Sequence, residues 1–205
     1  MKSIITIGRQ FGSGGRAIGK RLSEILGIPF YDKELIELAA EAGGMSAEVF
    51  SSVDEKAASG LVYSSASLMM GGEMRFSPQV ELPLNDKLFI LSSKVISSIA
   101  AKGPCVLIGR CADYVLRENK LLFSAFIHAP LGSRLERVTR LYSLSPDAAE
   151  KRINREDKQR SQYYVYFTGR TWASIENYQL ALDSSLLGEE GTAQLLAHIA
   201  KERGV

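Results

Sequence analysis

Short apolar runs alternate along this chain with segments in which apolar residues recur at helical spacing. Residues 3–7 form a β-branched run that ends at Gly8, and this pattern is typical of a buried strand. Four more apolar runs predict strands, at residues 29–31, 104–109, 121–128 and 178–182. Strands that alternate with helices build a parallel sheet covered on both faces. We therefore predict an α/β fold with three layers, α/β/α, around a five-stranded parallel sheet.

Several of the helical segments have recognisable ends. Apolar residues recur at helical spacing over residues 18–26, and Gly27 is expected to end that helix. Asp32 is well placed to cap a second helix that runs to Ala40. Ser145 followed by a proline predicts a helix start, because serine caps a helix and proline suits its first turn. Further helices are expected at residues 86–101, 131–138 and 189–200.

The pattern weakens over residues 43–83, which contain serine pairs, two prolines and the run Met69-Met70-Gly71-Gly72. One interpretation is a surface loop. The other is a mobile insertion that closes over a substrate, because lids come from poorly packed regions. Both stay open on the sequence alone. The whole chain has 205 residues, enough for one well-cored domain and too few for two, so we expect a single domain over residues 1–205.

Composition narrows the class of protein further. The 25 basic and 23 acidic residues give a net charge of +2, so no global field favours nucleic acid. Cys105 and Cys111 make neither a metal-ligand spacing nor a disulfide framework, and no metal motif is apparent. The apolar N-terminal stretch is too short for a signal peptide, and no run approaches the roughly 20 apolar residues of a membrane span. We expect a cytoplasmic protein without membrane or nucleic-acid partners.

A glycine cluster lies between the first predicted strand and the first predicted helix, and it contains Gly12, Ser13, Gly14, Gly15 and Arg16. A turn of this kind points successive backbone N–H groups inward, and the helix that follows adds its unpaired amides and the positive end of its dipole. Glycine is needed where a side chain would block a phosphate or where φ is positive. The alternative is a plain tight turn, but residues 8–16 contain four glycines, counting Gly8, together with a serine and an arginine, and this exceeds what a turn requires. The cluster predicts a phosphate-binding loop.

Two further groups of residues favour anion chemistry. Arg110 follows the third predicted strand, at the sheet edge where ligands of parallel sheets bind, and a guanidinium there holds a phosphate through two hydrogen bonds. The alternative for Arg110 is a surface ion pair. The helix after Ser145 carries Arg152, Arg155 and Arg160. A run of charged residues is usually a solvent-exposed helix face. The alternative is an arginine-bearing lid, and it is worth considering here only because the glycine cluster and Arg110 also favour anion binding.

These residues resemble the cytidylate kinase-like family, relatives of the bacterial CMP kinases among the P-loop nucleoside monophosphate kinases, over essentially the whole chain. The run of residues 8–15 is similar to the family's signature, Gly109-Arg110 to the start of a Gly-Arg-Asp motif, and residues 155–160 to an arginine-rich lid. Tyr31-Asp32 falls where CMP kinases open their monophosphate-binding segment. The resemblance implies a P-loop kinase fold, a monophosphate-binding type of insertion at residues 43–83 and a lid at residues 145–170.

The chain also departs from the general phosphate-loop pattern G-x-x-x-x-G-K-[ST]. When Gly14 is aligned with the last glycine, Gly15 stands at the lysine, Arg16 at the hydroxyl position and Arg9 at the first glycine. Arg16 is the candidate for the missing positive charge. Cys111 stands where the family has the aspartate after Gly-Arg, which leaves Asp113 as the nearest carboxylate.

The resemblance implies a kinase that uses ATP and Mg²⁺ and phosphorylates a nucleoside monophosphate, with CMP or dCMP as the first candidate. The glycine turn and Arg16 would bind the triphosphate, and Arg152, Arg155 and Arg160 would close on the transferred phosphoryl group. Asp32, Arg110 and Asp113 would hold the acceptor, with Asp32 alternatively binding Mg²⁺ through water. Two alternatives stay open: a nucleotide-binding regulatory module with little turnover, and a small-molecule kinase with a non-nucleotide acceptor such as shikimate or gluconate. The sequence says nothing about oligomeric state.

Overall fold

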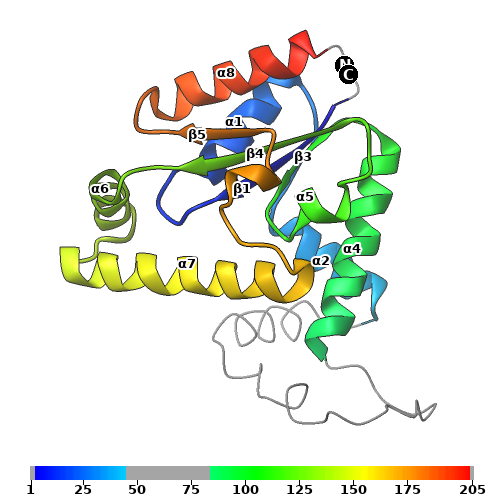
Figure 1. The fold of residues 1–205 in the computed structure, drawn as a ribbon, viewed down its shortest axis with the longest axis horizontal. Coiled ribbons are helices and arrows are strands. Elements are labelled where there is room, and N and C mark those ends of the chain that lie inside the picture. The colour runs from blue at the N-terminus through cyan, green and yellow to red at the C-terminus, as the bar shows by residue number, and fades with distance from the viewer. Residues whose placement is uncertain (1–2, 45–83, 204–205) are drawn as a thin grey trace.

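The computed structural model of the protein describes residues 3–44 and 84–203, and within them it contains the predicted five-stranded sheet (Figure 1). The strands are β1 (Ile4–Arg9), β2 (Phe30–Tyr31), β3 (Cys105–Ile108), β4 (Leu122–His128) and β5 (Leu180–Asp183). They lie in the order β2-β3-β1-β4-β5, and every neighbouring pair is parallel. The predicted parallel α/β architecture is confirmed.

Helices cover both faces of this sheet. On one face pack α1 (Gly15–Leu26) and α8 (Gly188–Glu202), and on the other lie α2 (Glu34–Ala42), α4 (Leu84–Lys102) and the short α5 (Ala112–Val115). Figure 1 shows these two layers on opposite sides of the strands, with α7 (Pro146–Thr168) running below the sheet and α6 (Leu131–Tyr142) at one end of α7. A 3₁₀ turn, Ile175–Asn177, leads into β5.

The central strand explains where the candidate site lies. In β1, Ile4 packs into the core under α4 and α5, whereas Ile5 and Ile7 pack under α1 and α8, and all three are fully buried. Because both faces are covered, β1 is an apolar run rather than an alternating one. The strand emerges from the core at Arg9, between the carboxyl ends of β3 and β4. That edge is where parallel sheets bind their ligands.

Most predicted helix ends are confirmed. Gly27 ends α1 with a φ of 63°, and the Ser145 hydroxyl accepts a hydrogen bond from the Ala148 N–H at the start of α7. The predicted cap at Asp32 is wrong: α2 begins at Glu34, and no side chain caps it. The predicted start of the last strand at residue 178 is two residues early.

The predicted insertion falls almost entirely on residues 45–83, outside the described residues. None of the described helices is long and apolar enough to span a bilayer.

Candidate phosphate-binding site

The turn between β1 and α1, residues 10–14, has the backbone that its glycines require, and we call it the glycine turn. Gly12 and Gly14 have φ values of 80° and 81°, in the left-handed region that favours glycine. A Cβ on Gly12 would lie 2.9 Å from the Val138 Cγ2 atom of α6, so close packing also demands glycine there. The first intrahelical hydrogen bond of α1 runs from the Ile18 N–H to the Gly14 carbonyl. The amides that precede Ile18 therefore lie at the positive end of α1, which suits an anion.

Ser13 shapes the glycine turn from inside. Its side chain is buried, and its hydroxyl donates a hydrogen bond of 2.9 Å to the Gln10 carbonyl. The Ser13 N–H points to the same carbonyl, and the Ser184 hydroxyl donates to the Ser13 carbonyl at 2.6 Å. These contacts fix the turn, and the Ser13 hydroxyl is occupied within the protein.

Arg16 and Asp32, predicted to serve different substrates, form an ion pair with each other. The Arg16 Nε donates to an Asp32 carboxylate oxygen at 2.5 Å, and the other oxygen lies 3.9 Å from an Arg9 nitrogen. This hydrogen bond raises the pKa of Arg16. The Arg16 side chain is 59% exposed and the Asp32 side chain only 12%, so Asp32 lies in the site while Arg16 reaches it from the rim. A charge-assisted bond of this kind is also why Asp32 does not cap α2.

The three predicted lid arginines of α7 have different surroundings. Arg160 donates a hydrogen bond of 3.1 Å to the Arg9 carbonyl, and burial lowers its pKa. Arg152 stacks over the rings of Phe11 and Tyr142, with its guanidinium carbon 3.8 Å from the Tyr142 centroid. Arg155 is 63% exposed and pairs with the neighbouring Glu156. The structure therefore brings Arg160 to the carboxyl edge of the sheet and leaves Arg155 at the surface.

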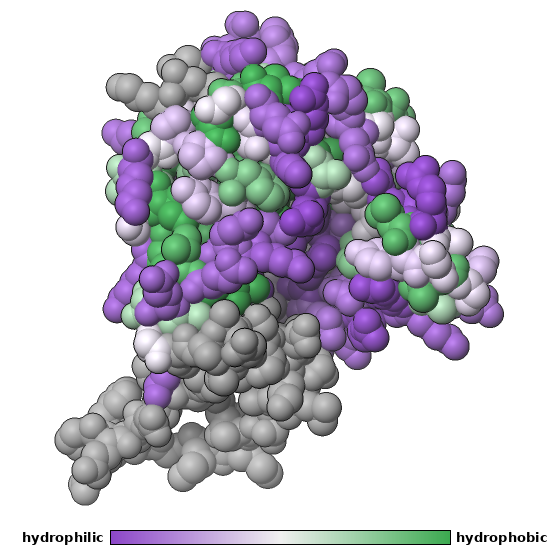
Figure 2. Space-filling view, turned by 180° about the vertical axis from the view of Figure 1, so that it is seen from behind, coloured by the Kyte–Doolittle hydropathy of each residue, from purple (hydrophilic) through white to green (hydrophobic). Residues whose placement is uncertain are grey.

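Two cavities meet at this edge. One, of about 280 Å³, is formed by the glycine turn, the start of α1, Arg137, Tyr142 and Arg160, and we call it the loop cavity. The other, of about 250 Å³, lies beyond β1 and β3, and we call it the strand-end cavity. Taken together they reach the range of small-molecule sites, roughly 300–1,000 Å³. On the molecular surface, Figure 2 shows hydrophilic residues around a recess between the larger body of the molecule and the smaller lobe on the right of the view.

The strand-end cavity combines cationic, acidic and aromatic side chains. Arginines from three separate elements line it, Arg9, Arg110 and Arg160, together with the predicted acceptor residue Asp113. Further lining residues come mainly from α7 and the segment after it: Glu156, Gln159, Tyr163, Tyr164, Trp172 and Tyr178. A cavity lined by both guanidinium groups and aromatic rings suits a ligand that carries both a phosphate and a ring.

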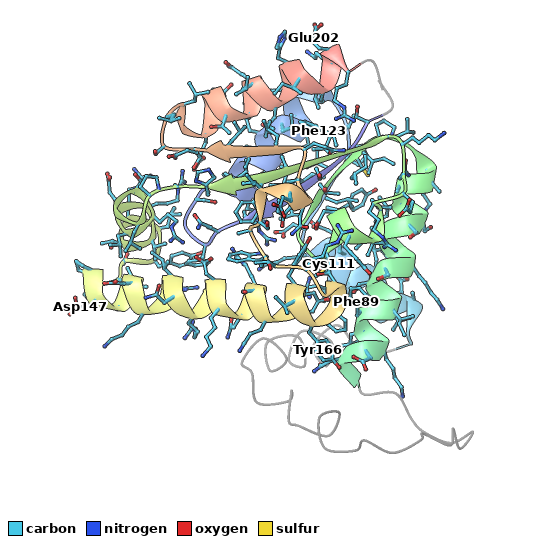
Figure 3. All side chains as sticks on the ribbon, in the orientation of Figure 1. Phe89, Cys111, Phe123, Asp147, Tyr166 and Glu202 are labelled. Atoms are coloured by element: carbon cyan, nitrogen blue, oxygen red, sulfur yellow. The ribbon has the colours of Figure 1, made fainter. Side chains whose placement is uncertain are left out.

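The backbone that carries Arg110 is unusual. Gly109, Arg110 and Cys111 have consecutive φ values of 67°, 58° and 54°, all in the left-handed region. For residues with a Cβ this costs of the order of 1–2 kcal/mol each, and such residues cluster at functional sites. Figure 3 places Cys111 between the sheet and the last turns of α7, and its side chain is buried. The strained turn thereby directs Arg110 into the strand-end cavity.

Asp113 is held by α7. The Tyr164 hydroxyl donates a hydrogen bond of 2.7 Å to its carboxylate, and both side chains are buried. Burial raises the pKa of Asp113, although the bond from Tyr164 acts in the opposite direction. The carboxylate is thus fixed in orientation at the wall of the strand-end cavity.

Several site residues were not predicted from the sequence. Arg137 pairs with Glu189 of α8, and one of its nitrogens would lie 2.8 Å from a Cβ on Gly14, so it lies over the glycine turn. Trp172 and Tyr178 pack against Phe126, and they also line the strand-end cavity. For these residues the sequence offered no signal, because the cavity is built from segments far apart in the chain. Arg9 did carry a signal, its place at the first glycine of the phosphate-loop pattern.

Comparison with known proteins agrees with this architecture. The family model "Cytidylate kinase-like family" matches residues 4–186. A cytidylate kinase from Methanopyrus kandleri is 26% identical over 202 residues, which cover 94% of this chain and 90% of the relative. A solved structure of an uncharacterized protein from Eubacterium ventriosum superimposes with a TM-score of 0.71 and 23% identity, over 98% of this chain and 99% of that one. A shikimate kinase from Bacteroides thetaiotaomicron has a TM-score of 0.55 and 14% identity, over 98% and 99% of the two chains.

The structural likenesses lie below 25% identity and concern the fold, which is that of the P-loop kinases. The family match is a match of sequence, and it supports membership of a family as well as a fold. It covers the chain from β1 to the residues after β5. The resemblance seen in the residue motifs is thereby confirmed. The chain belongs to the cytidylate kinase-like family.

Proposed function

We propose that the protein transfers the γ-phosphoryl group of ATP to a nucleoside monophosphate, with CMP or dCMP as the first acceptor to test. One observation carries the proposal: the loop cavity and the strand-end cavity share Arg9 and Arg160 as a common wall. A phosphoryl group that passes between a donor in one cavity and an acceptor in the other would cross between these two guanidinium groups. Phosphoryl transfer is catalysed mainly by such positioning and charge stabilisation.

The donor would bind at the glycine turn. The first amides of α1 would contact its phosphate oxygens, with the positive end of the helix behind them. Arg160 is the lid arginine that we assign to the phosphoryl group in transfer, because it reaches both cavities. Arg152 would support the wall of the loop cavity through Phe11 and Tyr142, and Arg155 has no comparable contact with either cavity.

The acceptor would bind in the strand-end cavity. Arg110 would hold its phosphate, and the fixed carboxylate of Asp113 would accept hydrogen bonds from the sugar or the base. Tyr163, Trp172 and Tyr178 provide aromatic surface of the kind on which a pyrimidine packs. The combination favours an acceptor that has both a phosphate and a ring over a small polar acid.

Mg²⁺ is implied by this chemistry, in which it would neutralise negative charge on the phosphates when bound. Within residues 3–44 and 84–203, no three histidine, cysteine or acidic side chains form a group able to hold a metal ion. Asp32 already faces Arg16 and Arg9, so it fits as a residue that contacts the ion through water rather than directly. Most of the ligands would then come from the nucleotide and from water, as is usual for Mg²⁺.

The test is ADP formation by the purified protein from ATP and Mg²⁺, with a panel of nucleoside monophosphates and, in parallel, shikimate and gluconate. Turnover with CMP or dCMP well above the other acceptors supports the proposal. Turnover only with a non-nucleotide acceptor would keep the kinase chemistry and reject the acceptor. ATP binding without ADP formation for any acceptor would instead favour a nucleotide-binding regulatory module.

A further inference from the structure

The two most unusual residues of the phosphate loop, Arg9 and Gly15, fit each other in space. A Cβ on Gly15 would lie 2.6 Å from the Arg9 Cβ, closer than real Cβ atoms approach other atoms, and 3.1 Å from the Arg9 Cγ, which is a tight contact. The stem of Arg9 therefore lies across the Cα atom of the position where the general pattern has its lysine. A side chain at residue 15 and an arginine at residue 9 exclude each other, so the two departures are complementary.

The guanidinium of Arg9 extends beyond Gly15 to the end of β3. There it contacts Gly109 so closely that a Cβ on Gly109 would overlap the Arg9 Nη1 atom. The Nη2 atom lies 3.9 Å from an Asp32 oxygen. The side chain thus starts at the end of β1, crosses the start of α1 and ends between the loop cavity and the strand-end cavity, both of which it lines.

The surroundings of Arg9 carry an excess of positive charge. The pKa of Arg9 is lowered to about 9, mainly by the burial of its side chain. The positive charges of Arg160, Arg110 and Arg16 lower this pKa further, whereas the negative charge of Asp32 raises it. Clustering partly buried cations against one another is costly unless an anion compensates them. A polyphosphate bound between Arg9 and Arg160 would supply that compensation.

We propose that Arg9 supplies to the triphosphate the positive charge that a lysine supplies in the general phosphate-loop pattern. This inference deepens the proposed function and assigns the charge to Arg9 in place of Arg16. Arg16 is mostly exposed and its guanidinium is bound to Asp32, whereas Arg9 lies at the boundary of the two cavities. The planar guanidinium of Arg9 presents a fork that matches two phosphate oxygens.

The spatial complementarity defines a sharp experiment with three variants: Arg9→Gly, Gly15→Lys and the double variant R9G/G15K. Arg9→Gly removes the charge, and we expect ATP affinity to fall at least about tenfold, and turnover by about 10²- to 10³-fold where turnover exists. Gly15→Lys introduces a clash with the Arg9 stem and is also expected to bind ATP poorly. The double variant removes the clash and restores a lysine, so it should recover most of the ATP affinity.

Binding is measured by calorimetry with ATP, ADP and adenosine, which makes the result independent of any acceptor. Loss confined to ATP and ADP, with adenosine unchanged, is the expected signature of a phosphate contact. Arg9→Gln keeps the stem over Gly15 without the charge, so it tests the inference even where Arg9→Gly does not fold. Arg21→Gln is the matched control, because Arg21 is an exposed arginine of α1 that pairs with Glu190.

The outcomes separate this inference from the proposed function. Unchanged ATP affinity in folded Arg9→Gln protein would overturn the role of Arg9, whatever the acceptor. Equal loss for ATP and adenosine would also overturn it, because the effect would then be structural. The expected affinity pattern in a protein that forms no ADP with any acceptor would keep the role of Arg9 and reject phosphoryl transfer.

Discussion

The Asp157 carboxylate of α7 accepts a hydrogen bond of 2.7 Å from the backbone N–H of Phe11, the second residue of the glycine turn. Its second oxygen accepts a bond of 2.5 Å from Arg134 of α6, which also donates to the Phe11 carbonyl at 3.3 Å. Both charged side chains are largely buried. The helix that resembles a lid is therefore fastened to the phosphate loop at this residue, and the loop is shaped before any ligand binds.

We predict that Asp157→Ala destabilises the protein and weakens ATP binding together. The change leaves the Phe11 N–H without its acceptor and the buried charge of Arg134 without its carboxylate, a loss of about 3–5 kcal/mol for breaking a buried pair. Urea denaturation measures the free energy of unfolding, and calorimetry the affinity.

The matched control for Asp157→Ala is Glu150→Gln, which removes an exposed carboxylate from the same helix and should change stability by less than about 0.5 kcal/mol. An Asp157→Ala protein as stable as this control would contradict the fastening of α7 to the loop.

A second prediction concerns Gly109, whose Cα is covered by the Arg9 guanidinium. Gly109→Ala must tolerate an alanine at a φ of 67° and must also displace Arg9. Gly27→Ala is a close control, because its φ is 63° and nothing lies within 4 Å of the added methyl group. Both variants should lose about 1–2 kcal/mol of stability from the backbone alone.

Only Gly109→Ala should also lose ATP affinity, because only it moves Arg9. Unfolding and ATP titration of the two variants side by side separate backbone strain from the displacement of Arg9. An equal ATP affinity in both variants would show that the approach of Arg9 to Gly109 does not matter for binding.

The third prediction is a pH dependence that arises from Asp113 and Tyr164. Burial raises the pKa of Asp113 above its ordinary value of 3.8, so the protonated form is favoured in the folded state. The contribution of protonated Asp113 to the stability of the folded protein is therefore fully present below pH 3.8. It is lost as the pH rises through the raised pKa of Asp113. Tyr164→Phe removes a hydrogen bond to the charged form, worth about 1.5–3 kcal/mol, and raises the pKa of Asp113 further.

We expect the stability cost of Tyr164→Phe to grow as the pH rises through the raised pKa of Asp113, because the hydrogen bond that it removes favours the charged form. In an Asp113→Asn background the same substitution should show no such pH dependence. Unfolding curves at several pH values provide the measurement, and a penalty for Tyr164→Phe that does not vary with pH in the natural background would count against this account.

The comparison of sequence and structure shows which level of organisation a single sequence encodes. Strands and most helix ends follow from local patterns, as with Gly27 and Ser145, because caps and left-handed glycines depend on neighbouring residues. Asp32 was misassigned because a cap, worth about 1 kcal/mol, competes there with a charge-assisted bond to Arg16, sixteen residues away. The glycine turn was apparent from its composition. Its fastening by Asp157 was not, since that contact spans 146 residues.

The arginines of α7 show the same limit and give the last prediction. Arg155 and Arg160 are five residues apart, so at 3.6 residues per turn they point in directions that differ by about 140°. A charge run cannot reveal which direction faces the sheet. In the structure Arg160 donates to the Arg9 carbonyl and lines both cavities, whereas Arg155 is exposed and pairs with Glu156.

We therefore predict that Arg160→Ala lowers kcat about 10³-fold or more with the best acceptor, because arginines that stabilise the transferred phosphoryl group contribute on that scale. Arg155→Ala should lower it far less, since it removes an exposed ion pair worth about 0–1 kcal/mol. Steady-state kinetics with both variants measure the contrast, and unfolding curves establish that each is folded. A loss in Arg155→Ala as large as that in Arg160→Ala would mean that the opposite face of α7 approaches the nucleotide during turnover, and the assignment of Arg160 alone would then be wrong.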